Sequence, residues 1–389
     1  VKFVREATGT TVEYLSENQF DDKTKNFISI GETSLLSEAK FNLDISKLGD
    51  SGYIIKSDEN GNLYIIGGDI QNGWMGLMCG VYDLLHEFFG YEYYSDGVYG
   101  LTKNVTSAAF FEGELDKTVV PSFEYRLRGY GFNAENSVDG VFNAYRLRMN
   151  SLYTFSFKNL GMHDIFGAIP YANYGASHKN WYTRDKNQVC FSRDPDGIAK
   201  TVVDKMLPII TAAENQNPEL KSLNKYFYVG MTDSTVWCDC PTCKTYINSH
   251  GGYKVSTYIN FMNKVAALLK NQNRTDIRPV MLAYHATQDA PVKENADGSL
   301  SLVSADMKLD ELVTVYYCPI EANYYVPFGD DSDGTGRNVA ALKNLKGWSV
   351  AADKVMYYFY MENFPNYYMN YFDVTRSIQQ NFKYAAENG

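Results

Sequence analysis

Three acidic side chains stand at or shortly after the ends of segments with the hydrophobic pattern of buried strands. They are Asp233, Glu362 and Glu321. In a (β/α) barrel the carboxyl ends of all the parallel strands lie on one face, so these carboxylates are predicted to meet there. Cleavage of a glycosidic bond needs two carboxyl groups, one of them protonated so that it can assist the leaving group. The pattern therefore indicates acid–base catalysis by a pair of carboxyl groups, for which glycoside hydrolysis is one candidate reaction.

The roles of the three acids follow from their distance to the strand ends. Asp233 is the predicted general acid. Glu362 is preferred over Glu321 as the base or nucleophile because it stands closer to the end of its strand. Each has a structural alternative: Asp233, with Ser234 beside it, could cap the following turn, and either glutamate could be a solvated or hydrogen-bonded side chain.

Basic residues accompany two of the predicted strands. Arg126 and Arg128 alternate within residues 123–131, so both side chains point to the same face of that strand. They are predicted to bind substrate, and the alternative is a structural ion pair with a carboxylate of the barrel. His285 follows another strand and is predicted to hydrogen-bond a sugar hydroxyl.

A long segment, residues 156–190, is expected to lie over the mouth of the barrel. It contains His163, His178 and Trp181, which we assign to substrate binding. The indole ring of Trp181 would offer a flat apolar platform for a sugar ring. The alternative is that these side chains are packed in the interior.

The six cysteines include three within six residues, in the spacing Cys238-x-Cys240-x₂-Cys243. Three thiols at this spacing suit one side of a tetrahedral zinc site, with His250 or Cys190 as the fourth ligand. The alternatives are one disulfide with a free thiol, or three reduced thiols. No cofactor is predicted for catalysis, and structural zinc is the one metal that the sequence indicates.

The first hundred residues have the pattern of a small α/β domain. A strand is predicted at 27–31, and two strands at 52–57 and 62–67 are joined by a turn containing Asn60-Gly61. Apolar residues at helical spacing fill residues 73–89, and Gly90 is placed to end this helix. We predict a discrete α/β sandwich domain over residues 1–118, with residues 101–120 as an extended connector.

From Pro121 onward, strand-like and helix-like segments alternate, which indicates a parallel sheet. The predicted fold for residues 119–389 is a (β/α)₈ TIM barrel that is incomplete at its C-terminus, and an open parallel sheet is the competing architecture. A further strand is expected inside residues 156–190. The six clear strands are expected at 123–131, 151–155, 226–231, 278–285, 312–317 and 354–360.

The composition limits the classes of partner. The formal net charge of −10 argues against nucleic acid, and no run of apolar residues is long enough to span a membrane. The 32 tyrosines suit a sugar-binding cleft, although they could equally fill the core. The first residues read as the tail of a helix, so we expect a piece of a longer, secreted precursor whose signal peptide is not in this chain.

Two parts of the chain resemble known families. Residues 64–99 (YIIGGDIQNGWMGLMCGVYDLLHEFFGYEYYSDGVY) resemble the N-terminal domain that precedes the barrel in family 67 α-glucuronidases and family 20 β-hexosaminidases. The rest is similar to domain of unknown function family 4838, which occurs in secreted proteins of gut bacteria. The similarity rests on His163 after Gly161 and on residues 188–195 (QVCFSRDP), 232–243 (TDSTVWCDCPTC) and 345–348 (LKGW).

The resemblance implies a glycoside-hydrolase type of barrel with an oligosaccharide or polysaccharide substrate. In the resembling hydrolases the general acid ends the fourth strand, where Asp233 is expected to fall. Active hexosaminidases have an Asp-Glu pair here, whereas this chain has Asp233-Ser234, which disfavours a substrate-assisted mechanism. Tyr317 replaces an Arg that relatives commonly carry before Cys318. The competing hypothesis is a cell-surface or carbohydrate-binding protein that retains the barrel without turnover.

Overall fold

The computed structural model describes residues 1–22, 24–68, 75–95, 97–102, 113–126, 145–149, 153–158, 161–361 and 373–388. The chain divides into two compact units, Val1–Ser151 and Leu152–Gly389. The predicted boundary at residue 118 lies earlier than this division and falls within a strand at Asp116–Val119, described below.

The first unit is a small α/β structure. Its strands β1, β2, β3 and β6 form one sheet in the order β1-β3-β2-β6. Strands β1 and β3 are parallel, and the other two pairs are antiparallel. The described elements are α1 (Lys2–Thr8), β1 (Ile28–Ile30), α2 (Ser34–Ala39), β2 (Tyr53–Ser57), β3 (Leu63–Gly67), α3 (Met75–Phe89), β4 (Glu92–Ser95), β5 (Val98–Gly100) and β6 (Asp116–Val119).

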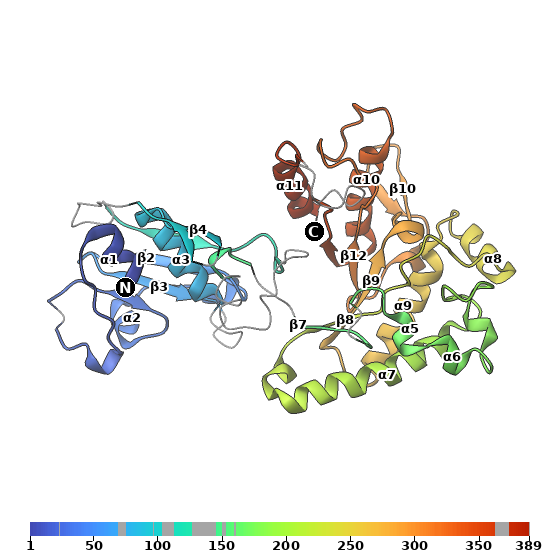
Figure 1. The fold of residues 1–389 in the computed structure, drawn as a ribbon, viewed down its shortest axis with the longest axis horizontal. Helices are drawn as coiled ribbons and strands as arrows, with labels where there is room; N and C mark the ends of the chain where they lie inside the picture. Colours follow the sequence, from blue (N-terminus) through green and yellow to red (C-terminus); the bar gives the residue numbers. More distant parts are fainter. Residues whose placement is uncertain are drawn as a thin grey trace. The chain divides into compact units, whose positions relative to one another are not determined.

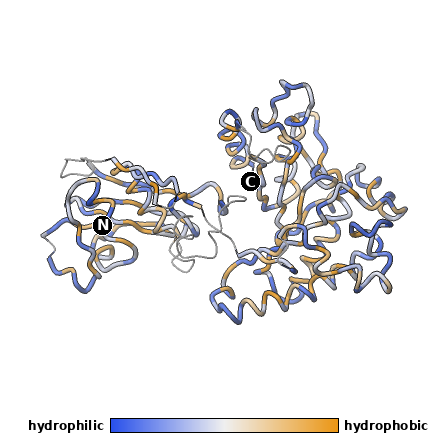
Figure 2. The backbone as a smooth tube through the Cα atoms, viewed as in Figure 1, coloured by the Kyte–Doolittle hydropathy of each residue, from blue (hydrophilic) through white to orange (hydrophobic). Residues whose placement is uncertain are grey.

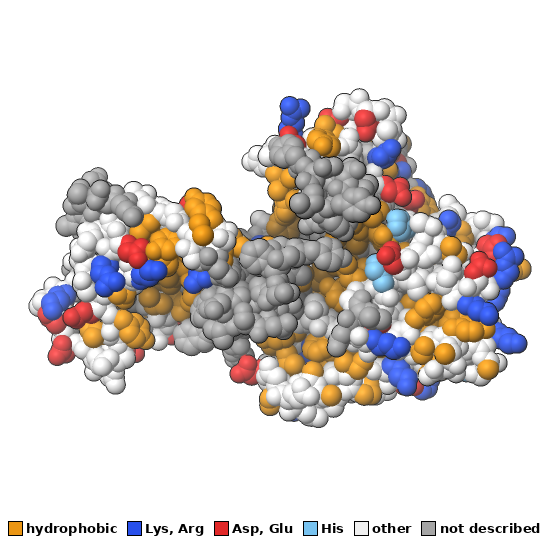
Figure 3. All heavy atoms as spheres, viewed as in Figure 1, with side chains coloured by type: hydrophobic (Ala, Val, Ile, Leu, Met, Phe, Trp, Pro, Cys, Tyr) orange, Lys and Arg blue, Asp and Glu red, His pale blue; other side chains and the backbone are white. Residues whose placement is uncertain are grey.

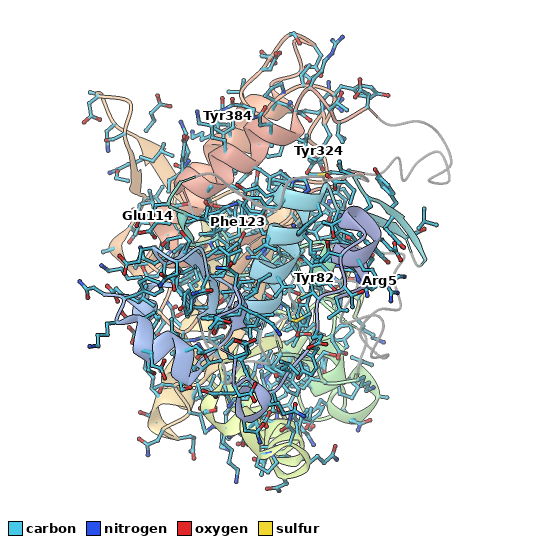
Figure 4. All side chains as sticks on the ribbon, turned by 90° about the vertical axis from the view of Figure 1, so that its left-hand side faces the viewer. Arg5, Tyr82, Glu114, Phe123, Tyr324 and Tyr384 are labelled. Atoms are coloured by element: carbon cyan, nitrogen blue, oxygen red, sulfur yellow. The ribbon has the colours of Figure 1, made fainter. Side chains whose placement is uncertain are left out.

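Alternating residues of β2 and β3 bury both faces of this sheet. Ile55 and Ile65 belong to the core beneath α1 and α3, whereas Ile54 and Ile66 belong to the core on the opposite face. Helices α1 and α3 lie side by side, and Figure 4 labels Arg5 on the first and Tyr82 on the second. The sheet is therefore the centre of a layered unit, as the alternation of apolar residues predicts.

Local signals set several of these boundaries. Gly61 has a φ of +80° in the turn between β2 and β3, and Gly90 has a φ of +59° after α3. Both angles are in the left-handed region that glycine adopts without strain. The expected connector, in contrast, contains β6, whose residues pair with β2 from Tyr53↔Val119 to Lys56↔Asp116. This pairing holds the connector in the first unit.

The second unit is built on a parallel sheet. Its strands β7, β8, β9, β12 and β13 lie in the order β13-β12-β9-β8-β7, and every pair is parallel. The described elements are β7 (Tyr153–Phe155), α5 (Ile165–Ala168), α6 (Tyr171–Tyr174), α7 (Pro195–Gln216), β8 (Lys225–Tyr228), α8 (Pro241–Ser249), α9 (Val255–Asn271), β9 (Ile277–Ala283), β10 (Val292–Glu294), β11 (Leu300–Leu302), β12 (Thr314–Tyr317), α10 (Arg337–Ala351), β13 (Lys354–Tyr357) and α11 (Ile378–Asn388).

Each strand of this sheet lies beside the next sheet strand in the sequence. Such an order is that of a (β/α) barrel, whereas a doubly wound sheet reverses its order at a switch point. Helices α7 and α9 pack against each other, and α9 also contacts β9 (Figure 1). The hydrophobic segments in Figure 2 follow the strands and the helix faces that cover them. The protein is therefore a mixed α/β protein with a parallel sheet, and closure into a complete barrel stays a prediction.

Two of the predicted barrel strands differ from the structure. Strands β7 and β8 pair directly with each other, from Tyr153↔Lys225 to Phe155↔Phe227, so the strand expected inside residues 156–190 does not lie between them. Another strand was expected at residues 123–131. Residues 123–126 of this segment are described, and they do not form a strand. Counted from that predicted first strand, β8 is the third rather than the fourth.

Candidate functional site

The carboxyl ends of β8, β9 and β12 meet at one edge of the parallel sheet, because parallel strands all point the same way. Tyr284 and His285 come directly after β9, and Asp233 and Glu321 lie in the loops after β8 and β12. The described part of the chain brings these four side chains and His163 into one chain of contacts. Figure 3 shows histidine and acidic side chains together on a face of the second unit.

Asp233 is held by a hydrogen bond from the neighbouring strand end. The Tyr284 hydroxyl donates to Asp233 Oδ1 over 3.1 Å. The ring of Tyr284 is buried, whereas Asp233 is exposed to solvent. The turn after Asp233 is capped by its neighbour, since the backbone N–H of Val236 donates to Ser234 Oγ over 3.1 Å. Asp233 is therefore not the residue that caps this turn.

His285 lies between Tyr284 and Glu321. Its ring centroid is 3.9 Å from that of Tyr284, and its Nδ1 is 3.9 Å from Glu321 Oε1. That separation is too long for a hydrogen bond, and within the described residues the buried Nδ1 has no hydrogen-bond partner. The φ of His285 is +47°, in the left-handed region that residues other than glycine rarely adopt. The unusual backbone angle and the unsatisfied ring nitrogen make His285 a candidate functional residue.

His163 reaches the same edge because of a close backbone approach. Its Nδ1 donates to the carbonyl oxygen of Met231 over 3.0 Å, and its ring lies 5.4 Å from that of Tyr284. A Cβ atom at Gly230 would lie 1.7 Å from the carbonyl oxygen of Met162, so no other residue fits at Gly230 without moving this segment. The glycine is thus the reason that His163 can lie beside the end of β8.

Tyrosine rings from three strands cover the same face of the sheet. The rings of Tyr228 and Tyr316 stack at 6.3 Å although β9 lies between their strands. Tyr358 contacts Tyr316 at 5.8 Å and Tyr360 at 4.8 Å. Burial raises the pKa of Tyr360 well above its usual value. These rings form an apolar wall with hydroxyl groups along it.

Three of the predicted substrate-binding residues are placed elsewhere. Trp181 is 2% exposed, and its indole N–H donates to Asp194 over 2.8 Å, so the prediction that it stacks on a sugar ring is wrong. His178 lies against Trp181, with ring centroids 4.0 Å apart. Arg126 donates to the carbonyl oxygens of Phe123 and Arg148 within the first unit, so its predicted place on a barrel strand is also wrong.

Two predicted residues, Arg128 and Glu362, lie outside the described residues. Their assignments as substrate-binding and catalytic residues therefore stay predictions. Glu321, the less favoured glutamate in the sequence, is the one that lies near His285.

The second cluster of reactive side chains consists of Cys190, Cys238, Cys240 and Cys243, all buried, with sulfur atoms within 4.8 Å of one another. Hydrogen bonds from Cys238 and Cys243 hold the pKa of the Cys190 thiol well below its usual value, and those from Cys190 and Cys238 raise the pKa of Cys243. Soft thiolate groups in this number could hold a metal ion.

His250, the other fourth ligand considered in the sequence, is occupied by different partners. Its Nε2 is 2.9 Å from Asp306 Oδ2, and its Nδ1 is 2.7 Å from the carbonyl oxygen of Tyr246. The structure therefore selects Cys190 as the fourth member of the cluster. Cys190 is remote from the other three in sequence, and only its residue type could have indicated this.

The fold and the strand ends define a class of protein: a mixed α/β protein with a polar site at the carboxyl edge of a parallel sheet. The chain belongs to the family described as "Domain of unknown function (DUF4838)", which matches residues 108–389. The family expected from the sequence is thereby confirmed. No curated protein matches the chain. In the described residues, no helix is long and apolar enough to cross a membrane.

One solved structure that is similar to this chain is a family GH115 4-O-methyl-α-glucuronidase with specificity for decorated arabinogalactans. The two share 14% sequence identity with a TM-score of 0.44. The match covers 98% of this chain and 50% of the enzyme, so this chain spans half of the length of that enzyme.

Proposed function

We propose that the protein is a glycoside hydrolase whose active site lies at the carboxyl edge of the parallel sheet. The observation that carries the proposal is the contact between Asp233 and Tyr284, which joins an exposed carboxylate to the neighbouring strand end. In a (β/α) barrel, side chains at these strand ends face the substrate. Asp233 acts as the general acid that protonates the leaving-group oxygen.

A second carboxylate is needed on the other side of the bond that is cleaved. Glu321 fits this role because it lies in the loop after β12, near His285. In glycosidases the two carboxyl groups lie about 5 Å apart for retention of configuration and about 6.5–9.5 Å apart for inversion. Glu362 remains the other candidate, on its position after β13 in the sequence.

The other side chains at the carboxyl edge of the parallel sheet have the chemistry needed to bind a sugar. We assign His285 and His163 to the binding of sugar hydroxyl groups, because both rings contact Tyr284, the partner of Asp233. The tyrosine wall, with Tyr228 and Tyr316 stacked on each other, offers apolar faces with polar tips, as sugar rings require. Together these groups support an oligosaccharide or polysaccharide as the substrate.

The alternative is a protein that binds a glycan without cleaving it. It is favoured by the exposure of Asp233, because a general acid is usually desolvated before it can work near neutral pH. The two functions make different predictions for the same sample. A hydrolase releases sugar from a glycan, whereas a binding protein retains the glycan unchanged.

The test is a screen of the whole chain against glycan libraries, with released reducing sugar and bound glycan measured in parallel. Asp233→Asn should abolish release, by about 100-fold or more, while binding and melting temperature stay unchanged. Asp239→Asn is the matched control, because Asp239 is an exposed acid of the same loop whose contact is with Lys244. Undiminished release by Asp233→Asn would refute the assignment, and binding without release by the wild type would establish the alternative.

A further inference from the structure

We propose that Cys190, Cys238, Cys240 and Cys243 bind one zinc ion, which fastens the loop between β8 and α8 to the segment that precedes α7. Four thiolates at about 2.3 Å from a tetrahedral zinc ion lie about 3.8 Å from one another. The Cys190 sulfur is 3.8 Å from that of Cys240 and 3.6 Å from that of Cys243. The side chains are thus already spaced as ligands of one ion.

The same distances exclude disulfides in this arrangement. A disulfide requires a sulfur–sulfur distance of about 2.05 Å, and all four cysteines are free. The four ligands also complete a tetrahedron with no position left for water or substrate. Closed sites of this kind stabilise structure, whereas catalytic zinc sites keep one position open. The ion is therefore structural.

Donors around the sulfur atoms offset the charge of the site. A zinc ion with four thiolates carries a net charge of −2, which is costly to bury without hydrogen bonds. The backbone N–H of Cys243 donates to Cys240 Sγ over 3.4 Å. The positive charge of the Arg193 guanidinium interacts favourably with Cys190, Cys238 and Cys240. The chain thus supplies the outer contacts that a thiolate site needs.

The four cysteines come from two segments of the chain, and local hydrogen bonds fix their positions. Cys240 caps the N-terminus of α8, which places Cys243 in its first turn. Cys190 is fixed by a backbone hydrogen bond to Trp181 over 2.8 Å. Beside the cluster, the rings of Phe191 and Trp237 stack at 5.5 Å. Phe191 follows Cys190 and Trp237 precedes Cys238, so the two segments that carry the cysteines also pack against each other through these rings.

The proposed zinc site lies close in sequence to Asp233. Thr232 Oγ1 donates to the carbonyl oxygen of Asn187 over 2.7 Å, so the loop after β8 is attached to the same segment at its other end. Asp233 lies between this attachment and the cysteine cluster. Bound zinc should therefore limit the movement of the Asp233 backbone. An effect of zinc on activity rests on the proposed function, whereas the binding of zinc does not depend on it.

Zinc is favoured over iron, which also accepts four thiolates, because it stands higher in the order of affinities for such ligands. The first measurement is the metal content of wild-type protein purified without chelator. We expect about one zinc per chain. Cys190→Ser and Cys243→Ser should each lose most of this zinc. Cys318→Ser, which changes a buried thiol of the same unit outside the cluster, should keep it.

A second measurement uses the wild-type protein, so that the proposal can be tested even if the cysteine variants fail to fold. Zinc is removed from the wild type by a chelator under reducing conditions, and Co²⁺ is added while folding is followed by circular dichroism. We expect the visible and near-ultraviolet bands of tetrahedral cobalt thiolate, and we expect Zn²⁺ to displace them. Iron in the purified protein, zinc retained by Cys190→Ser, or a folded apoprotein that binds neither ion would overturn the proposal.

The zinc proposal and the assignment of Asp233 as general acid can be tested independently. Asp233→Asn should contain as much zinc as the wild type, because Asp233 is not a ligand. If that variant is fully active and zinc is still present, the hydrolase proposal fails and the zinc site stands. If zinc is absent and Asp233→Asn is inactive, the reverse holds.

Discussion

The hydroxyl group of Tyr284, the first residue after β9, donates a hydrogen bond of 3.1 Å to Asp233 in the loop after β8. The same tyrosine contacts the rings of His163 and His285. One side chain thus holds three polar residues that come from three separate segments. Because its ring is buried, Tyr284 is a fixed point from which the others are positioned.

Tyr284→Phe removes the hydrogen bond to Asp233 and keeps the ring. We expect kcat for glycoside hydrolysis to fall about tenfold, which corresponds to ~1.4 kcal/mol for a hydrogen bond to a charged group. KM should change little, because the ring still fills its place. Tyr14→Phe is the control, since Tyr14 is 86% exposed. An unchanged kcat in Tyr284→Phe would separate this contact from catalysis.

The second carboxylate is tested by a pair of substitutions. We expect Glu321→Gln to lower kcat by roughly 100-fold, as the loss of a general base does. Glu362→Gln is measured beside it, and Glu294→Gln, in the exposed hairpin of β10, is the control. A larger loss in Glu362→Gln than in Glu321→Gln would assign the role to Glu362 instead.

Gly230→Ala tests the contact that brings His163 to the strand end. The added Cβ would lie 1.7 Å from the carbonyl oxygen of Met162, so the segment carrying His163 must move. We expect a loss of about 1–3 kcal/mol in the free energy of unfolding, together with weaker glycan binding. Lys221→Ala, at an exposed position shortly before β8, is the control. Wild-type stability and binding in Gly230→Ala would contradict the argument.

Local sequence signals predicted much of the fold. The turn before β3 and the end of α3 depend on Gly61 and Gly90, whose positive φ angles are properties of a few neighbouring residues. The alternation of strands and helices from Pro121 likewise predicted a parallel sheet. The sequence also placed His285 after a strand, and the structure has it just beyond β9, whereas Asp233, which was expected to end its strand, lies in the loop after β8.

The errors have a common physical cause, which is contact between distant residues. Strand β6 is short and half polar, and only its pairing with β2 makes it a strand. Trp181 is buried by Asp194 and Tyr174, and a tryptophan in a loop has the same sequence pattern whether buried or exposed. Cys190 joins three cysteines that are far along the chain. Spacing alone could not choose it over His250.

A buried ion-pair network at the other end of β8 supports the strand. Lys225 is 0% exposed, and its ammonium group lies 2.7 Å from Asp276 and 3.1 Å from Glu214. Arg274 bonds to the same two acids at 2.9 Å and 2.6 Å. In a (β/α) barrel, residues at this end of the strands contribute to stability rather than to chemistry. Removing Lys225 leaves the buried Glu214 and the half-buried Asp276 with Arg274 as their one remaining cation among these four residues.

Lys225→Met should therefore reduce the free energy of unfolding by about 3 kcal/mol at neutral pH without changing the residues of the active site. The control is Lys205→Met, at an exposed position of α7. Both are measured by urea denaturation. A loss in Lys225→Met no larger than that of the control would show that the network contributes little.

The network also predicts how stability depends on pH. Burial raises the pKa of Asp276, but hydrogen bonds from Arg274 and Lys225 outweigh it and lower the pKa to about 2. A carboxyl group whose pKa is lower in the folded than in the unfolded state stabilises the fold above the unfolded value, near 4. That contribution is lost as the pH falls from about 4 to about 2. In Lys225→Met one of the hydrogen bonds that lower the folded-state pKa of Asp276 is missing, so that pKa should be higher, and the loss should be smaller and end at a higher pH than in the wild type. Urea denaturation from pH 7 down to pH 2 measures both curves, and curves of the same shape would rule out this role of Lys225.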